Sequence, residues 1–488
     1  MTESAKPAAE HSGALDINEA FRSGGCSPAF LDQINKACIV MLAEVGIVPR
    51  ATAARIAAGI KTVIEQMQAS GVPRRSADYL DYEPRLTAVV GADASRLHSG
   101  RSRQDLASAM ARMNLRDGLL QEIDALYLAR EKTLALAALH VETIIPAYTH
   151  GVQAQPTTFA HYLHALGAAL ARETQRLREA YARINVNPLG AAALATSSFP
   201  LDRKRLAVLL GFDGLLENAY DANHLAPVDS ALEVASALSI AAVQIGQFAQ
   251  DLHTQYADPM PWFLLATGEL TGVSSIMPQK RNPAALEQLR AQSSILLGEM
   301  QTVFLISHNN RTGMFDYRMY DPVPCTRALQ VFKLLAQVMG GIVVNRERAL
   351  AEVHADYSTT TEIADALMQK ADVPFRIGHH FASRLTDYGR GNKLKIHEIP
   401  YAEAARIYRE QTQQALPLNE AAFREAISAE YMVFGRKGTG GPQLSEVNRM
   451  LAEARTGLAA DAAWLDHAKG SLARADAALE QVFGALCS

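Results

Sequence analysis

The stretch VDSALEVASALSIAAVQIGQFAQDL, residues 228–252, decides the fold class of this chain. Its apolar side chains recur at helical spacing around nearly the whole circumference: Val228, Leu232, Ala235, Leu238, Val243, Ile245, Phe248 and Leu252. A helix that is apolar on all sides packs among other helices rather than on a surface. The stretch therefore predicts a long helix in the middle of a bundle.

Two further stretches carry the same helical period. One lies between residues 109 and 135 and contains Met113, Leu120, Leu126 and Leu134. The other follows Pro283 and contains Leu286, Leu289, Leu296, Met300, Val303 and Leu305. Strand-like alternation is scarce, so we expect an all-α protein with a central long-helix bundle. Three mainly helical domains are predicted, over residues 1–110, 111–364 and 365–488.

Composition narrows the class of protein. The 488 residues are 49% hydrophobic and 20% charged, with a net charge of −4, which offers no electrostatic basis for binding nucleic acid or an anionic membrane. The N-terminal segment lacks the apolar core of a signal peptide, and residues 231–249 are interrupted by Ser and Gln before they could span a bilayer. The four cysteines fall at unrelated spacings, which indicates neither a zinc site nor a disulfide framework. We therefore predict a cytoplasmic protein.

A first polar segment, HSGRSRQD (residues 98–105), precedes the helix that starts near Leu106. Hydroxyl groups and two arginines at a helix N-terminus can bind a carboxylate. The alternative is a solvated basic turn in which Ser and Asp only cap the helix.

A second polar segment, YTHGVQAQPTT (residues 148–158), separates two helical stretches. It contains one imidazole, His150, a group suited to acid–base catalysis near neutral pH. The alternative is a helix break whose histidine is merely hydrogen-bonded. His161 and His164 lie one helical turn apart, but no third ligand stands nearby in the sequence, so no metal site is predicted.

A third polar segment, TGVSSIMPQKRNP (residues 271–283), brings two serines, a lysine and an asparagine into one short loop. These groups could act as a base, a cation and a hydrogen-bond donor, and the alternative is an ordinary linker. A Gly-rich run, GRKGTGGP (residues 435–442), does not fit a phosphate-binding loop and is predicted to be a structural turn.

Taken in this order, the three polar segments resemble signature regions of the fumarase/aspartase superfamily, and within it most of all those of the argininosuccinate lyases. The third is similar to G-S-S-x-M-P-x-K-x-N, the first to H-T-G-R-S-R-N-D and the second to G-Y-T-H-x-Q-x-A-Q-P. Further matches include Pro188-Leu189-Gly190, Leu201-Asp202-Arg203 and residues 373–376, so the resemblance covers nearly the whole chain. It implies a homotetramer in which each active site is built from three subunits.

The resemblance also implies a reaction, the β-elimination of fumarate from an N-substituted aspartate without a cofactor. Proton removal beside a carboxylate makes a doubly charged aci-carboxylate, which needs cations and donors around it. The family pattern makes Ser274 the general base, and Lys280 and Asn282 the groups that hold the carboxylate that gains charge. His150 would position the substrate or protonate the leaving amine. Expected substrate-binding residues are Ser102, Arg103, Gln104, Thr149, Ser275, Met277, His308 and Arg311.

Departures from the family pattern concern the substrate. Gln104 stands in place of an asparagine, and Val273 in place of the first glycine of G-S-S. The largest departure is residues 308–317, HNNRTGMFDY, where argininosuccinate lyases have a run like Y-N-K-D-M-Q-E-D-K-E. We call residues 308–317 the divergent segment.

Arginine and histidine side chains around the divergent segment, His308, Arg311 and Arg318, suit a carboxylate-bearing amine better than a guanidinium. We therefore expect the products to be fumarate and an aminocarboxylate or small diamine, as for an ethylenediamine-disuccinate lyase. Argininosuccinate cleavage and an inactive structural relative are the alternatives.

Overall fold

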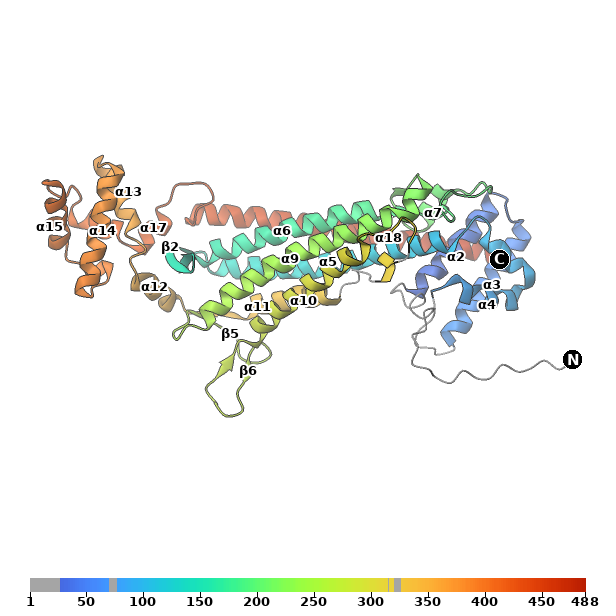
Figure 1. Ribbon diagram of the computed structural model, residues 1–488, viewed down its shortest axis with the longest axis horizontal. Helices are drawn as coiled ribbons and strands as arrows, with labels where there is room; N and C mark the ends of the chain where they lie inside the picture. The colour runs from blue at the N-terminus through green and yellow to red at the C-terminus, as the bar shows by residue number, and fades with distance from the viewer. Residues whose placement is uncertain (1–26, 70–76, 315, 320–325) are drawn as a thin grey trace.

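The computed structural model describes residues 27–69, 77–314, 316–319 and 326–488. It is an elongated bundle of long helices with a smaller helical cluster at each end (Figure 1). The described N-terminal helices and the C-terminus share one end, and the cluster around α14 forms the other. The prediction of an all-α protein with a central long-helix bundle is confirmed.

Six long helices build the bundle and bury the largest apolar cluster of the described residues. They are α5 (Arg103–Leu139), α6 (Phe159–Ile184), α9 (Ala226–Tyr256), α10 (Ala284–Ser307), α11 (Thr326–Gly341) and α18 (Leu444–Cys487). The predicted apolar helix is α9, on which Leu238, Ile245 and Leu252 are buried but Val243 is 45% exposed. Among the described helices, α9 alone is long and apolar enough to cross a membrane, and half of its most apolar stretch is buried inside the chain.

A second cluster lies at the N-terminal end. It is formed by α2 (Pro28–Glu44), α3 (Arg50–Ala69), α4 (Tyr79–Val90), the 3-10 helix η1 (Gly91–His98) and α7 (Arg203–Leu209). Leu479 and Phe483, from the end of α18, complete its apolar core. The predicted C-terminal domain therefore contributes its last helix to both other parts of the molecule, and the three-domain division stays a proposal.

The opposite end is a compact helical cluster reached through α12 (Arg346–Ala355). It contains α13 (Thr361–Ala371), α14 (Phe375–Asn392), η3 (Ile396–Glu398), α15 (Tyr401–Thr412), α16 (Glu420–Ala426) and α17 (Ala429–Phe434). The Gly-rich run at residues 435–442 is a turn between α17 and α18. There Nε2 of His161 lies 2.9 Å from the carbonyl oxygen of Gly440, which gives the run a structural contact.

Strands occur in the described residues only as four two-stranded pairs. Antiparallel pairs are β1 (Ile144–Thr149) with β2 (Val152–Thr158), β5 (Phe263–Leu265) with β8 (Ile342–Val344), and β6 (Gly272–Val273) with β7 (Arg281–Asn282). The parallel pair is β3 (Val186–Asn187) with β4 (Gly214–Leu215). Two of these pairs, β1–β2 and β6–β7, carry the second and third polar segments, so both segments are hairpins.

Candidate active site

The first polar segment ends in a capped helix start. Ser102 is the N-cap of α5, and its Oγ accepts a hydrogen bond from the N–H of Gln104 at 3.2 Å. In return, the carboxylate of Asp105 accepts from the N–H of Ser102 at 2.9 Å. The capping expected from Ser and Asp is therefore present, and it fixes the direction in which α5 leaves the segment.

Asp105 also ties this helix start to a distant loop. Its other carboxylate oxygen accepts from the N–H groups of Gly190 and Ala192, both at 3.0 Å. Burial raises the pKa of Asp105 to about 6, against the opposing effect of these N–H groups and of Arg101. A fully buried carboxylate with three backbone donors holds the two segments in one arrangement.

The loop at Gly190 is fixed from its other side by Arg203. The Arg203 guanidinium donates to the carbonyl oxygens of Leu189 at 3.2 Å and Leu216 at 2.8 Å. Gly190 has φ 86°, and a Cβ there would lie 2.7 Å from Cγ of Arg203. Glycine is thus required at this position by both the backbone angle and the close approach.

The predicted carboxylate ligands of the first segment already have partners within the chain. Arg103 forms an ion pair with Asp78, the N-cap of α4, with 3.0 Å between Nε and Oδ1. Gln104 donates from Nε2 to the carbonyl oxygen of Asn223 at 3.2 Å. For Arg103 to hold a substrate carboxylate, its pair with Asp78 would have to share or release the guanidinium.

The second polar segment is the β1–β2 hairpin. His150 and Gly151 form its turn with φ 54° and 76°, the two positive angles of a turn that matches the strand twist. Thr149 pairs with Val152 beside the turn, so the predicted Thr149 and His150 lie together at an exposed tip. Further down the hairpin, Nε2 of Gln153 donates to Oγ of Ser358 at 3.0 Å, which fixes it on the bundle end.

The third polar segment is the β6–β7 hairpin, which projects from the bundle (Figure 1). Oγ of Ser274 accepts a hydrogen bond from the N–H of Met277 at 3.1 Å. A donor at this oxygen favours its negatively charged form, as a serine base requires. Lys280, Ser275 and Met277 are exposed.

Two contacts at the base of the β6–β7 hairpin connect it to the bundle. Asn282 pairs with Gly272 there. The hydroxyl of Tyr256, the last residue of α9, donates to the carbonyl oxygen of Arg281 at 3.1 Å.

The divergent segment contacts a neighbouring short helix, and Arg318, the residue that follows the segment, contacts the start of α5. His308 is the C-cap of α10, and both His308 and Arg311 are exposed. Thr312 then contacts Tyr220 of α8 (Ala219–His224), with 3.0 Å between the two hydroxyl oxygens. In the 3-10 helix η2 (Asp316–Met319), Nη2 of Arg318 donates to Oγ of Ser108 on α5 at 3.2 Å.

The three polar segments do not meet within the described part of one chain. The first precedes α5 and the second follows it, and at about 1.5 Å per residue the 37 residues of α5 separate them by roughly 55 Å. The third projects away from the bundle between them. One chain alone therefore does not complete a site from all the residues that the sequence singles out.

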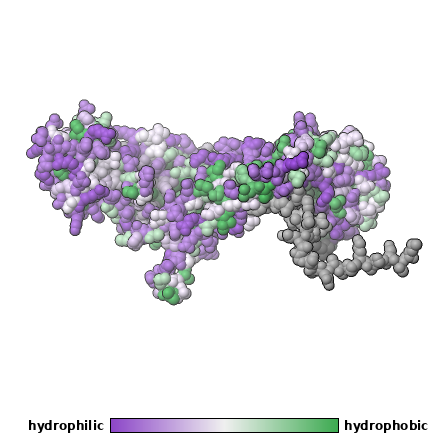
Figure 2. All heavy atoms as spheres, in the orientation of Figure 1, coloured by the Kyte–Doolittle hydropathy of each residue, from purple (hydrophilic) through white to green (hydrophobic). Residues whose placement is uncertain are grey.

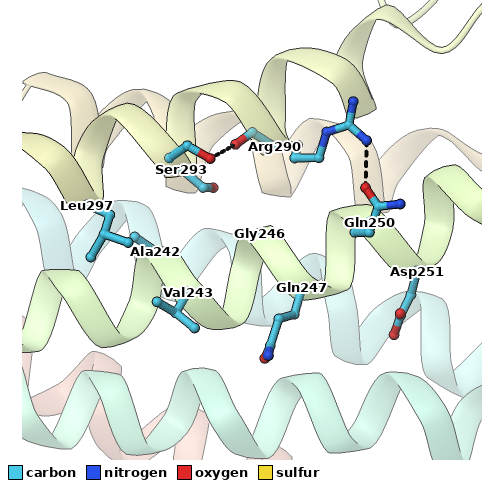
Figure 3. A pocket seen from close by; sticks show the side chains of 10 residues that line it. Ala242, Val243, Gly246, Gln247, Gln250, Asp251, Arg290, Ser293 and Leu297 are labelled. Carbon is cyan, nitrogen blue, oxygen red and sulfur yellow. Dashed lines mark hydrogen bonds between the residues drawn. The ribbon is translucent and has the colours of Figure 1, made fainter. Parts of the chain in front are cut away.

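A groove of about 610 Å³ runs between α9 and α10 on the bundle surface. Figure 3 shows it bounded by Val243 and Leu297 at one end and by Arg290 and Gln250 at the other, where Nη1 of Arg290 donates to Oε1 of Gln250 at 2.6 Å. Figure 2 shows apolar side chains gathered along the middle of the bundle. None of the predicted catalytic residues lines this groove, so we read it as a packing surface rather than as the active site.

Sequence reasoning missed Ser108, Asn223 and His224, which surround the start of α5. None of them belongs to a recognisable motif, so only the folded chain identifies them. The described residues hold no group of three or more His, Cys, Asp or Glu side chains placed to bind a metal ion.

Comparison with known proteins gives a consistent picture. A family profile described as Lyase matches residues 28–298, and one described as Argininosuccinate lyase C-terminal matches residues 357–433. The argininosuccinate lyase of Methanosarcina acetivorans is 32% identical over 435 residues, 87% of this chain and 86% of that protein.

Solved structures extend the comparison. A crystal structure of EDDS lyase in complex with formate is 30% identical, with a TM-score of 0.86, and the match covers 97% of this chain and 93% of that one. The 3-carboxy-cis,cis-muconate lactonizing enzyme of Pseudomonas putida shares the fold at 19% identity, with a TM-score of 0.69, 90% of this chain and 97% of that one being covered.

Proposed function

The chain belongs to the lyase family that includes the argininosuccinate lyases, and on that basis we propose that it is a fumarate-forming carbon–nitrogen lyase that cleaves an N-substituted aspartate. The observation that carries the proposal is the β6–β7 hairpin. It carries Ser274, Lys280 and Asn282 on one short loop, and it gives the Ser274 oxygen a backbone N–H donor. A base, a cation and an amide donor are the groups that this elimination needs.

In the proposed reaction, Ser274 removes a proton from the substrate carbon beside a carboxylate. The electron pair left behind spreads into that carboxylate, where Lys280 and Asn282 stabilise the added charge. The pair then forms the carbon–carbon double bond as the carbon–nitrogen bond breaks. The amine leaves with a proton that His150 supplies or directs, and fumarate remains.

We further propose that the active site is shared between chains of a cytoplasmic homotetramer. The length of α5 supports this, because it keeps the first and second polar segments apart within one chain. Apolar side chains exposed on α9 and α10 offer a surface for helix packing between subunits: Ile240, Val243, Ile295 and Leu305. Sedimentation analysis of the purified protein tests the tetramer directly, and a monomer with full activity would exclude a shared site.

The leaving amine in our proposal is an aminocarboxylate or a small diamine. The divergent segment supports this choice, since it has His308, Gly313 and Asp316 where argininosuccinate lyases have Tyr, Gln and Lys. Cleavage of argininosuccinate is the second candidate, favoured by the identity to the Methanosarcina acetivorans enzyme along most of both chains.

A panel of amines tests the proposal. Fumarate is mixed with arginine, ethylenediamine or single amino acids, and the loss of the ultraviolet absorbance of fumarate is followed. We expect addition of an amino acid or the diamine, with arginine the poorest partner because a guanidinium would face Arg311 or Arg318. If arginine is the best partner, the chain is an argininosuccinate lyase. If no partner reacts and no N-substituted aspartate is cleaved, it is an inactive relative.

A further inference from the structure

Arg318 occupies an unusual position for a partly buried arginine. Its Nε donates to the hydroxyl of Tyr317 at 2.8 Å and its Nη2 to Oγ of Ser108 at 3.2 Å, and its guanidinium lies over the Tyr317 ring at 5.3 Å. Both acceptors in the described residues are neutral hydroxyl oxygens. By contrast, the similarly buried Arg327 forms an ion pair with Glu299 at 3.0 Å. Arg318 is therefore held in place while its charge stays unmatched by a carboxylate of the described chain.

Its location links Arg318 to the first polar segment. Ser108, which accepts from Arg318, donates to the carbonyl oxygen of Gln104 at 3.0 Å. The guanidinium thus lies about one helical turn from Gln104, and near the positive end of the 37-residue helix α5. An anion bound beside Gln104 would meet both the helix start and Arg318.

His224 provides a second, independent sign of a ligand. It is the last residue of α8, is 8% exposed, and its Nδ1 is buried without a hydrogen-bond partner in the described structure. Gly313 of the divergent segment covers the ring, since a Cβ at that position would lie 3.4 Å from Nδ1. Burial and the charge of Arg318 lower the pKa of His224, which favours the neutral ring. A buried polar nitrogen without a partner is costly, and a bound oxygen would remove that cost.

From this arrangement we infer that Arg318, assisted by His224, binds a carboxylate of the leaving amine and so selects aminocarboxylates among the possible partners. The inference rests on the proposed lyase activity and specifies its substrate class. Arg318 forms the charge-assisted hydrogen bond, through the guanidinium nitrogen that has no acceptor in the described residues. His224 donates to a second carboxylate oxygen.

Two other arginines nearby are weaker candidates for this role. Arg103 is engaged by Asp78, and its removal would also break the contact between α5 and the start of α4. Arg311 is exposed, and no contact of its side chain with the described residues holds it toward α5. Of these three arginines, Arg318 is the one whose guanidinium is held toward α5 without a carboxylate partner in the described residues.

The test compares two amines of nearly equal size, glycine and glycinamide, as partners for fumarate in the full-length protein. We expect the wild type to have a higher kcat/KM for glycine than for glycinamide. In Arg318→Met the ratio of these two values should fall about 10- to 100-fold, while KM for fumarate changes little. Arg318→Glu should instead favour ethylenediamine over glycine, because ethylenediamine carries positive charge. His224→Gln should lower the glycine preference by a smaller factor and supplies the answer if the Arg318 variants do not fold.

Arg409→Met is the matched control, because it removes an exposed arginine of α15, far from α5. It should leave kcat/KM for both glycine and glycinamide unchanged. The inference is overturned if the wild type adds glycine and glycinamide equally well, if Arg318→Met keeps the preference, or if Arg311→Met removes it instead. Absence of any lyase activity in the wild type, with every amine, would instead refute the proposed function.

Discussion

The start of α5 and the β6–β7 hairpin are built in opposite ways. At the start of α5, Asp105 is fully buried and accepts three backbone hydrogen bonds, and Arg203 fixes the neighbouring loop. On the hairpin, Lys280 is exposed, Ile276 is 84% exposed, and Ser274 is held by backbone N–H groups of its own loop. The chain therefore places its proposed binding groups on a rigid frame and its proposed base on a lightly held loop.

This difference separates two kinds of substitution. Changes on the hairpin remove side chains that support nothing else in the described chain, so they should affect turnover and leave stability unchanged. Changes at the start of α5 break several hydrogen bonds among buried groups, so they should affect stability first. The predictions below test this separation, from the largest expected effect to the smallest.

Ser274→Ala should lower kcat by about 10⁴-fold, because it removes the proposed base. The melting temperature should stay within about 1 °C of the wild type, since Ser274 supports only its own loop. Steady-state kinetics and a thermal melt of the same preparation check both parts. Activity within a few-fold of wild type would transfer the role of base to another residue, with Ser275 the first to be replaced.

Lys280→Met and Asn282→Ala should each lower kcat by roughly 10²–10³-fold, the usual effect of deleting a donor aimed at developing charge. Lys280 is exposed, so Lys280→Met should not change the melting temperature. Asn282 lies in the β6–β7 pair, so its replacement could also disturb the hairpin. Asn282→Asp, which keeps the shape of the side chain, is the control for this effect. A change in KM alone for both residues would show that neither stabilises the aci-carboxylate.

Asp105→Asn should reveal a pH-dependent stability at the start of α5. The pKa of Asp105 is raised to about 6 by burial, above its ordinary value of 3.8, so folding opposes its ionisation. The stability associated with the protonated carboxyl is present at low pH and is lost as pH rises through 6. Between pH 4.5 and 7, the wild type should therefore lose about 2 kcal/mol of unfolding free energy relative to Asp105→Asn.

Urea unfolding at fixed protein concentration, at both pH values, measures this difference for Asp105. Asp466→Asn, which neutralises an exposed carboxylate on α18, is the control and should show no comparable change between pH 4.5 and 7. A constant difference between the wild type and Asp105→Asn would mean that the buried carboxyl titrates normally. The start of α5 would then differ from the hairpin in burial and hydrogen bonding, but not in the pKa of a buried acid.

Much of this comparison could be predicted from the sequence, and the reasons are physical. The period of residues 228–252 predicted α9, and the three polar segments predicted where the long helices are interrupted. The capping pair of Ser102 and Asp105 is a local pattern, so it too could be read directly.

Other features depend on contacts between residues far apart in the chain. The contact of Asp105 with Gly190 and the approach of Arg318 to Ser108 span 85 and 210 residues. No local pattern encodes such contacts. The buried ring of His224 gave no signal for the same reason.

Val273→Gly should produce the smallest effect and is the finest test of the hairpin. Val273 stands where the family pattern has glycine, yet it lies in β6, paired with Arg281, and no positive φ requires a glycine there. Its side chain is 78% exposed, so its loss removes almost no buried apolar surface. Glycine would mainly add backbone freedom, with a cost of about 0.5–1 kcal/mol confined to the two-residue strand pair.

The global melting temperature of Val273→Gly should not change, because the hairpin can open without the bundle unfolding. If the ordered hairpin is the form that places Ser274 against the substrate, kcat should fall only two- to five-fold, and amide hydrogen exchange at residues 272–282 should quicken. A much larger loss of kcat would show that Val273 itself contacts the substrate or another subunit, and the hairpin would then not be as lightly held as its own chain indicates.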